Sequence, residues 1–246
     1  MTANHTLSDF FIQQEQLELN DLFSPTVQLT RYDLDSYSDE LYPYFQIHQP
    51  LQSKLWSNKR KAQYLAGRLA AREALHSIGS PKPDIPIPSG HHREPLWPQN
   101  TLGSISHAEG FSVATAMNDG NFISNGIGLD VQEIISDTDL DLLSPSVLTT
   151  TDRLIYEAHS TGLSRNQIFT LIFSAKESFF KAAYGSVREY FNFDAVSVCD
   201  IDVEYQQITI ICEHDLSSDI LFQNEYPIFV DILDIGSPVA LTYSVV

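Results

Sequence analysis

Three charged side chains have types and spacing that could act together on a phosphate group. Glu177 and Lys181 are four residues apart, so on a helix they lie on one face. Asp130 follows a run in which Ile127 and Leu129 alternate with glycine, a pattern typical of a half-buried strand. A carboxylate at a strand end, combined with a carboxylate and an ammonium on one helix face, suits a divalent cation that holds a phosphate ester.

Each of these residues also has an ordinary structural interpretation. Ser174 and Glu177 have the spacing of a capping box that begins a helix, and Asp130 could be an acid in a turn at a strand end. Glu177 and Lys181 could form a plain helix pair, worth about 0.2–0.5 kcal/mol. Lys176 could face a phosphate or point equally well into solvent.

The elements that must position these groups can be read from periodicity and turn signals. Residues 57–78 give the clearest helix, which Ser57 or Asn58 could cap. A second helix is predicted over 173–184 and a third around 151–159. Further short strands are predicted near 26–29, 103–107, 111–117, 196–198, 207–212, 228–233 and 240–246. Periodicity alone predicts an α+β fold class, which could be divided into two lobes.

Charge is distributed unevenly along the 246 residues. The net charge of −18 argues against non-specific nucleic-acid binding, which depends on neutralising phosphates. Residues 54–93, however, contain eight of the fourteen basic residues and only two acidic residues. This basic window indicates a local anion site, and the alternative is a solvated helix face. The two cysteines, Cys199 and Cys212, support neither a disulfide framework nor a structural zinc site.

Several segments resemble the 4′-phosphopantetheinyl transferase superfamily, and they occur along the chain in the order expected of it. Residues 126–133 (GIGLDVQE) are similar to its metal-binding strand, and residues 173–181 (FSAKESFFK) are similar to its Lys-Glu helix. Residues 103–107 (GSISH) resemble its Ser-His segment. Residues 64–75 and 93–98 resemble the enterobactin synthase component D subgroup of that superfamily.

The resemblance implies a fold and a domain division. Large members of the superfamily are pseudo-dimers of two similar α+β halves with the site between them. We therefore expect an N-terminal half over residues 1–120, with the basic helix and the Ser-His segment. A C-terminal half over residues 121–246 is expected to carry the metal-binding strand and helix.

The resemblance also implies a reaction: transfer of the 4′-phosphopantetheine group from coenzyme A to a serine of an apo carrier protein, with release of 3′,5′-ADP. Magnesium is the implied cofactor, with Asp130, Gln132 and Glu177 as its ligands. Glu177 and Lys181 are the implied catalytic residues. The residues implied to bind coenzyme A are Arg60, Lys61, Arg68, Arg93, Ser106, His107 and Lys181.

Gln132 departs from the superfamily pattern, which has an acid at this position. The nearest acid is Glu133, whose side chain would leave the metal face if the strand continues. Gln132 could give a neutral oxygen or hold a metal-bound water, and a bulge could instead turn Glu133 inward.

The implied partners are carrier-protein domains of non-ribosomal peptide, polyketide or fatty-acid synthases, and the subgroup favours siderophore assembly. One alternative is a different magnesium-dependent coenzyme A or nucleotide enzyme, and another is a non-catalytic protein that binds coenzyme A and docks a carrier. No secretory signal or transmembrane run is found in the sequence, so we expect a cytoplasmic protein. Because a pseudo-dimer needs no partner to complete its site, we expect a monomer.

Overall fold

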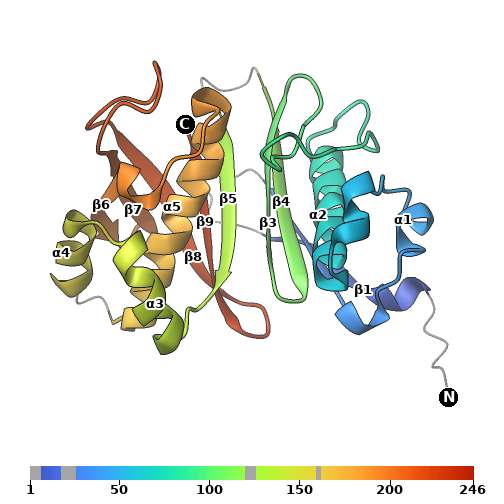
Figure 1. The fold of residues 1–246 in the computed structure, drawn as a ribbon, viewed down its shortest axis with the longest axis horizontal. Helices are drawn as coiled ribbons and strands as arrows, with labels where there is room; N and C mark the ends of the chain where they lie inside the picture. Colours follow the sequence, from blue (N-terminus) through green and yellow to red (C-terminus); the bar gives the residue numbers. More distant parts are fainter. Residues whose placement is uncertain (1–6, 18–25, 120–125, 159–161) are drawn as a thin grey trace. The chain divides into compact units, whose positions relative to one another are not determined.

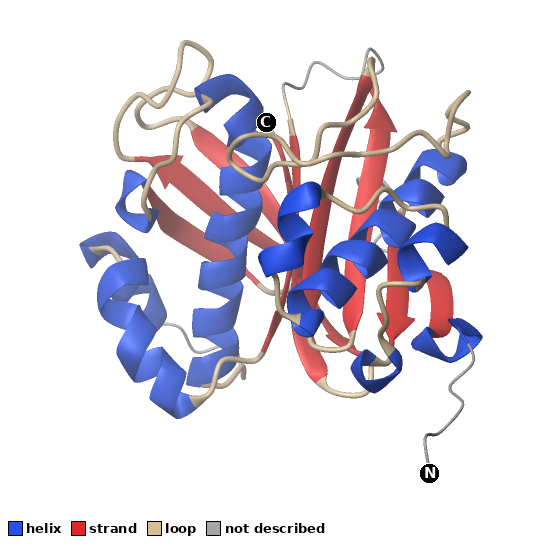
Figure 2. Ribbon diagram, turned by 45° about the vertical axis from the view of Figure 1, so that its right-hand side comes forward, coloured by secondary structure: helices blue, strands red, loops and turns tan. Residues whose placement is uncertain are grey.

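The structure is a computed structural model that describes residues 7–17, 26–119, 126–158 and 162–246. It divides into two compact units, Met1–Phe122 and Ile123–Val246. Each unit has one long helix packed on an antiparallel sheet (Figures 1 and 2), which confirms the predicted α+β class with two similar halves. The boundary predicted between residues 120 and 121 lies outside the described residues.

The N-terminal unit is a four-stranded sheet in the order β1-β2-β4-β3, with helix α2 packed against it. Ser57 caps α2 by accepting a hydrogen bond from the Arg60 backbone N–H, as predicted. The elements of this unit are η1 (Leu7–Phe10), β1 (Phe11–Leu17), β2 (Val27–Tyr32), η2 (Leu34–Ser36), α1 (Leu41–Tyr44), η3 (Leu51–Leu55), α2 (Asn58–Ser77), β3 (Thr101–Ala108) and β4 (Phe111–Asn118).

The C-terminal unit is a five-stranded sheet in the order β5-β9-β8-β7-β6, and helix α5 packs on β5 and β9. Its elements are β5 (Ile127–Glu133), α3 (Asp137–Val147), α4 (Thr150–Ala158), α5 (Arg165–Val187), η4 (Phe193–Ala195), β6 (Val196–Asp202), β7 (Gln207–Cys212), β8 (Glu225–Asp234) and β9 (Pro238–Val245). No helix in the described part of the chain is both long and apolar enough to cross a membrane.

Helix α5 begins eight residues before the predicted start at Phe173. Its N-cap is Ser164, whose hydroxyl accepts from the Gln167 backbone N–H at 3.2 Å, while the Gln167 side chain accepts from the Ser164 backbone N–H at 2.8 Å. This reciprocal pair is a capping box. The capping box considered for Ser174 and Glu177 is therefore wrong, because both residues lie inside a continuous helix.

Two glycines of the C-terminal unit allow α5 to approach β5 closely. A Cβ atom on Gly128 would lie 1.8 Å from the Ser178 carbonyl oxygen, and one on Gly126 would lie 2.0 Å from the Ala182 carbonyl oxygen. No side chain fits in such a space, so the strand backbone lies directly against the helix backbone. The Gly-x-Gly of the strand motif thus brings Asp130 and the middle of α5 within hydrogen-bonding distance.

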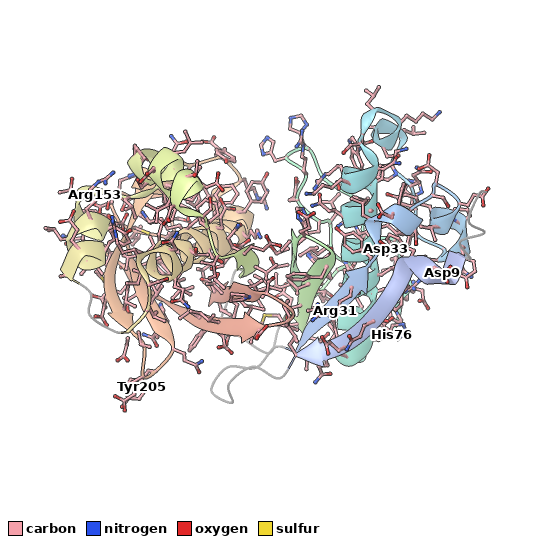
Figure 3. All side chains as sticks on the ribbon, turned by 90° about the horizontal axis from the view of Figure 1, so that it is seen from below. Asp9, Arg31, Asp33, His76, Arg153 and Tyr205 are labelled. Atoms are coloured by element: carbon pink, nitrogen blue, oxygen red, sulfur yellow. The ribbon has the colours of Figure 1, made fainter. Side chains whose placement is uncertain are left out.

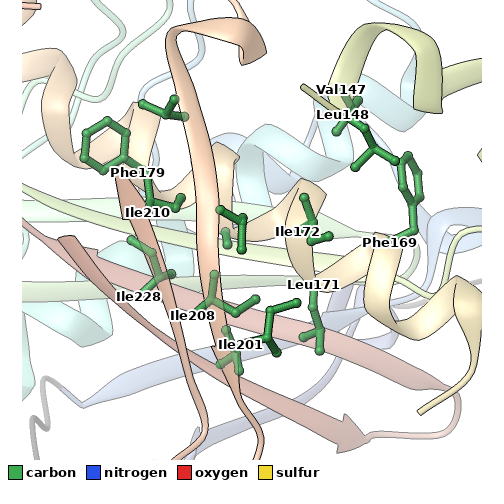
Figure 4. Packing of buried hydrophobic residues seen from close by; sticks show 14 of the residues in the cluster. Val147, Leu148, Phe169, Leu171, Ile172, Phe179, Ile201, Ile208, Ile210 and Ile228 are labelled. Atoms are coloured by element: carbon green, nitrogen blue, oxygen red, sulfur yellow. The ribbon is translucent and has the colours of Figure 1, made fainter. Parts of the chain in front are cut away.

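Helix α5 also contacts α3, α4 and strands β7 and β8. Arg153 on α4 ties the two short helices together, since its Nη2 donates to the Ser144 carbonyl oxygen at 3.1 Å (Figure 3). Apolar residues of α5 such as Phe169, Ile172 and Phe179 pack with Ile208 and Ile228 of the sheet (Figure 4). This core fixes the helix that carries the predicted Glu177 and Lys181.

Candidate functional site

The predicted site residues fall into two sets, one in each compact unit. In the C-terminal unit, Asp130 on β5 is buried and accepts hydrogen bonds from two residues of α5. Lys181 Nζ donates to its Oδ1 at 2.7 Å and also to the Leu129 carbonyl oxygen at 2.9 Å. Ser174 Oγ donates to its Oδ2 at 2.8 Å. Thr242, opposite Asp130 on β9, lies 2.9 Å from Ser174 Oγ and so supports that contact.

Glu177 lies between these contacts along α5, one turn after Ser174 and one turn before Lys181. Its side chain is partly buried, and burial raises the pKa of its carboxyl group. The Lys181 ammonium opposes that rise in the pKa, while the negative charge of Asp130 adds to it. The three residues predicted to act together are therefore electrostatically coupled in the structure.

Gln132 lies on the same face of β5 as Asp130, because the strand runs without a register shift from Ile127 to Glu133. Glu133 is exposed and lies on the opposite face. The suggestion that a bulge turns Glu133 inward is therefore wrong. Gln132 is the residue of this strand end that shares the Asp130 face.

Lys176 has neither of the environments considered for it from the sequence. Its side chain is only 2% exposed, so it faces neither a phosphate nor solvent. The ammonium forms a very short ion pair with the fully buried Asp152 and donates to three backbone carbonyl oxygens. Lysine and glutamate are adjacent in this motif, but here they belong to different environments.

In the N-terminal unit, Arg60 and His107 are brought together. Arg60 Nη1 lies 3.1 Å from His107 Nε2, and the guanidinium stacks over the Trp56 ring at 5.6 Å. Burial lowers the Arg60 pKa, and the nearby positive charges of Arg93 and Arg68 lower it further. Three of the predicted cations thus form one cluster around Arg60, and their mutual repulsion favours binding of an anion.

The other predicted residues of this unit are placed differently. Lys61 Nζ lies 3.0 Å from both carboxylate oxygens of Asp39, so its charge is already compensated. Ser106 is buried and, as the neighbour of His107 on β3, lies on the opposite face of the sheet. The sequence motif therefore does not put these two side chains on one surface.

Arg68 is buried and stacks on Tyr64, with its guanidinium carbon 4.3 Å from the ring centroid. Its Nη2 donates to Ser89 Oγ at 3.1 Å. It lines a cavity of about 20 Å³ together with Arg72 and His48.

The oxygen donors near Asp130 fit a magnesium ion. Two carboxylates, Asp130 and Glu177, repel each other at a partly buried position, and a divalent cation would relieve that repulsion. Gln132 adds an amide oxygen on the same strand face. Within the described ranges, no three His, Cys, Asp or Glu side chains form a metal cluster by themselves. Magnesium commonly uses one or two carboxylates, with water and substrate phosphates completing its shell.

Comparison with known families gives the same assignment in both units. Residues 53–117 match the 4′-phosphopantetheinyl transferase N-terminal domain, and residues 126–231 match the 4′-phosphopantetheinyl transferase superfamily. Together the two matches span more than half of the chain. The chain belongs to the 4′-phosphopantetheinyl transferase superfamily.

Curated relatives in this superfamily include enterobactin synthase component D of Salmonella typhi, 34% identical over 157 residues that cover 63% of this chain and 61% of the relative. The same-named protein of Escherichia coli strain K12 is 36% identical over 126 residues, 51% of this chain and 55% of the relative. The chain thus matches less than two thirds of the length of these relatives.

A solved structure with similarity to the chain is a holo-(acyl-carrier-protein) synthase from Bacillus anthracis in complex with coenzyme A (3′,5′-ADP). It has 21% sequence identity and a TM-score of 0.35, and the match covers 50% of this chain and 95% of that one.

The superfamily motifs did not reveal several residues that organise the site. Thr242 could be recognised only from the pairing of β5 with β9, which no local pattern predicts. Asp152 belongs to a separate helix, and nothing in its local sequence connects it to Lys176. Ser174 could have been recognised from its spacing. It lies one helical turn before Glu177 and Ser178, so it shares a helix face with them, and that side of α5 meets the glycine-rich strand.

Proposed function

We propose that the protein transfers the 4′-phosphopantetheine group of coenzyme A to the hydroxyl group of a serine in an apo carrier protein. The observation that carries the proposal is the coupled group of Asp130, Glu177 and Lys181, on the two motifs that define the superfamily. The similarity to enterobactin synthase component D supports aryl and peptidyl carrier proteins of siderophore assembly as the acceptors. A cytosolic location and a monomeric state stay predictions.

The reaction forms one bond and breaks one bond at the β-phosphorus atom. The serine Oγ attacks this phosphorus, the bond to the bridging oxygen breaks, and 3′,5′-ADP leaves with that oxygen. Glu177 accepts the serine proton, directly or through a water molecule.

Positive charge must offset the charge that develops on the leaving diphosphate. Lys181 supplies one cation next to Asp130. Magnesium held by Asp130, Glu177 and the Gln132 amide oxygen would supply charge stabilisation for the phosphate oxygens. In the N-terminal unit, Arg60, with the neighbouring Arg93 and His107, is our candidate for binding the 3′-phosphate of coenzyme A.

The test is an intact-mass measurement of apo carrier proteins after incubation with the protein, coenzyme A and magnesium. We expect a mass gain of one phosphopantetheine, release of 3′,5′-ADP, and loss of both on chelation. Tight coenzyme A binding without a mass gain on aryl, peptidyl or acyl carriers would support the alternative of a non-catalytic docking protein.

A further inference from the structure

The buried Lys176 ammonium contacts four oxygen acceptors in the C-terminal unit, and the proposed reaction has no role for it. Its Nζ donates to the carbonyl oxygens of Val147 at 3.0 Å, Phe193 at 3.1 Å and Val196 at 2.9 Å. It also forms the short ion pair with Asp152. These four acceptors come from the end of α3, from α4, from η4 and from the start of β6.

Asp152 is in turn held in place by the backbone. Its Oδ1 accepts from the Val198 N–H at 2.6 Å, and its Oδ2 accepts from the Thr149 N–H at 2.7 Å. The carboxylate therefore has hydrogen bonds from two separate segments in addition to the ammonium. The pair is a rigid anchor, since neither partner can move without leaving a buried charge unpaired.

The anchor holds α5 on the side away from β5. At about 100° per residue, Lys176 and Ser178 point about 200° apart around the helix. The Ser178 carbonyl lies against Gly128 of β5, whereas Lys176 points to α3, α4 and β6. Glu177 lies between these two directions. The rotation of α5 about its axis, and with it the direction of Glu177, is thus fixed from two opposite sides.

Apolar packing holds α5 against the sheet but is a less directional constraint on that rotation. The core around α5 contains many aliphatic side chains, and the hydrophobic effect that buries them is non-directional. The three N–H donors of the Lys176 ammonium, shared among four oxygen acceptors, are directional by contrast. A buried ion pair is often no more stabilising than an apolar pair of the same size, and a role in geometry is the hypothesis that the variants below test.

We propose that Lys176 is a positioning residue, whose ion pair with Asp152 fixes the rotation of α5 so that Glu177 faces Asp130. The inference rests on the proposed function, because it assigns Lys176 to the alignment of the proposed general base. It also gives the two adjacent residues of the Lys-Glu motif different roles: Glu177 acts on the substrate, and Lys176 holds the helix in place.

The main test uses the double variant Lys176→Met/Asp152→Leu, which removes both charges and leaves no buried ion unpaired. We expect it to melt below the wild-type temperature, since the Val198 and Thr149 N–H groups and three carbonyl oxygens lose their partners, so kcat is compared at a temperature where both proteins are folded. We expect kcat to fall about 10- to 100-fold, the loss that a misplacement of about 1 Å can cause. The KM for coenzyme A should change less than about threefold, because the cationic cluster is untouched.

A matched control is Arg153→Ala. Arg153 neighbours Asp152 and links α4 to α3, but its contact with Ser144 does not involve α5 (Figure 3). We expect this variant to keep the wild-type kcat. An equal loss of kcat in the control would show that general loosening of α3 and α4 is responsible, and it would overturn the proposal.

A second measurement reports the position of α5 without any turnover. The Gly128 α protons lie close to the Ala182 backbone N–H, because a Cβ on Gly128 would be 2.7 Å from that nitrogen. We expect the nuclear Overhauser contact between them to weaken in the double variant and to persist in Arg153→Ala. If wild-type protein transferred nothing, the proposed function would fail, but this measurement would still decide the role of Lys176.

Asp152→Asn provides a second variant if the double variant does not fold: it leaves the Lys176 ammonium without its counter-charge but keeps the side-chain shape and one acceptor oxygen. A weakened contact between Gly128 and Ala182 together with a lower kcat supports the proposal. Wild-type values of both quantities, in whichever of the two variants folds, would overturn it and leave Lys176 with a role in stability alone.

Discussion

Lys181 donates its hydrogen bond of 2.7 Å to the same carboxylate, Asp130, that we propose as a magnesium ligand. One ammonium and one metal ion would therefore share a single acid. The Lys181 side chain is about one quarter exposed, whereas Asp130 is buried. This relationship suggests that Lys181 neutralises the carboxylate before metal binding and is then close enough to act on the diphosphate.

Replacing Lys181 should separate these two effects. In Lys181→Met we expect kcat to fall about 10²-fold or more, because one charge-stabilising donor is lost. We expect the magnesium concentration for half-maximal activity to stay the same or fall, because the ammonium no longer competes for Asp130. Magnesium titration of the transfer rate checks both quantities. A strongly raised midpoint would mean that Lys181 helps to hold the metal.

The raised pKa of Glu177 predicts how its removal affects stability. A carboxyl group with a higher pKa in the folded state binds its proton more tightly there, so its contribution favours folding at low pH and is lost as pH rises past about 4.3. In metal-free buffer, Glu177→Gln should therefore melt at a higher temperature than wild type at pH 7. The difference should vanish at about pH 3, well below the usual pKa of glutamate, where the acid is protonated in both states. Calorimetry at several pH values measures this.

The same substitution should remove activity. We expect Glu177→Gln to lower kcat by about 10²- to 10⁴-fold, the usual contribution of general acid–base catalysis. Glu133→Gln is the matched control, since Glu133 is exposed on the other face of β5. We therefore expect Glu177→Gln to be inactive and yet more stable than wild type at pH 7. This combination indicates a residue that serves the reaction at a cost in stability. Full activity in that variant would contradict our assignment of the base.

Close packing of α5 on β5 predicts a large effect for a small change. In Gly128→Ala, the new methyl group would meet the Ser178 carbonyl at 1.8 Å, and both atoms belong to rigid backbone. We expect destabilisation of about 1–3 kcal/mol, typical of overpacking, and a loss of activity. Gly90→Ala is the control, because there the methyl group would meet only the flexible Glu94 side chain. Equal denaturation midpoints for the two variants would contradict this view of the interface.

The sequence predicted the acids and cation of the C-terminal unit because local spacing determines them. Two residues four apart on a helix must share a face, and alternation along a strand puts Asp130 and Gln132 on one side. The prediction that Glu177 lies near both Asp130 and Lys181 needed the superfamily resemblance as well, since strand and helix are far apart in the chain. The structure adds the mechanism of their approach, which is the pair of strand glycines.

The sequence could not predict burial or long-range partners. Lys176 and Lys181 are both lysines of one helix, yet only the first is buried, because the fully buried Asp152 lies on its side of α5. Lys61 lies next to Arg60, but Asp39 neutralises it. Charge counting treats such residues alike, because it carries no information about which acids the fold brings beside them. The start of α5 was missed although Ser164 and Gln167 carry a capping-box signal.

The contrast between Arg60 and Lys61 predicts unequal roles in binding coenzyme A. Arg60→Ala should weaken binding of coenzyme A much more than that of dephospho-coenzyme A, by roughly 10- to 150-fold for one charge-assisted contact. Lys61→Ala should have a small effect on both ligands, because Asp39 already compensates its charge. Calorimetric titration with the two ligands tests this. Equal losses for both ligands in Arg60→Ala would assign the cluster to carrier docking or to the fold.

Gln132 is the point at which this chain departs from its superfamily, and its position now allows a sharp prediction. It shares the face of Asp130 on a regular strand, whereas Glu133 is exposed on the other face. Gln132→Glu should lower the magnesium concentration needed for half-maximal activity, because a charged oxygen binds the ion more strongly than an amide oxygen. Gln132→Ala should raise that concentration, and Glu133→Ala should leave it unchanged. All three variants should melt near the wild-type temperature, since neither side chain is in the core. If none of them shifts the magnesium midpoint, then Asp130 and Glu177 hold the ion without Gln132, and the departure at this position has no consequence for metal binding.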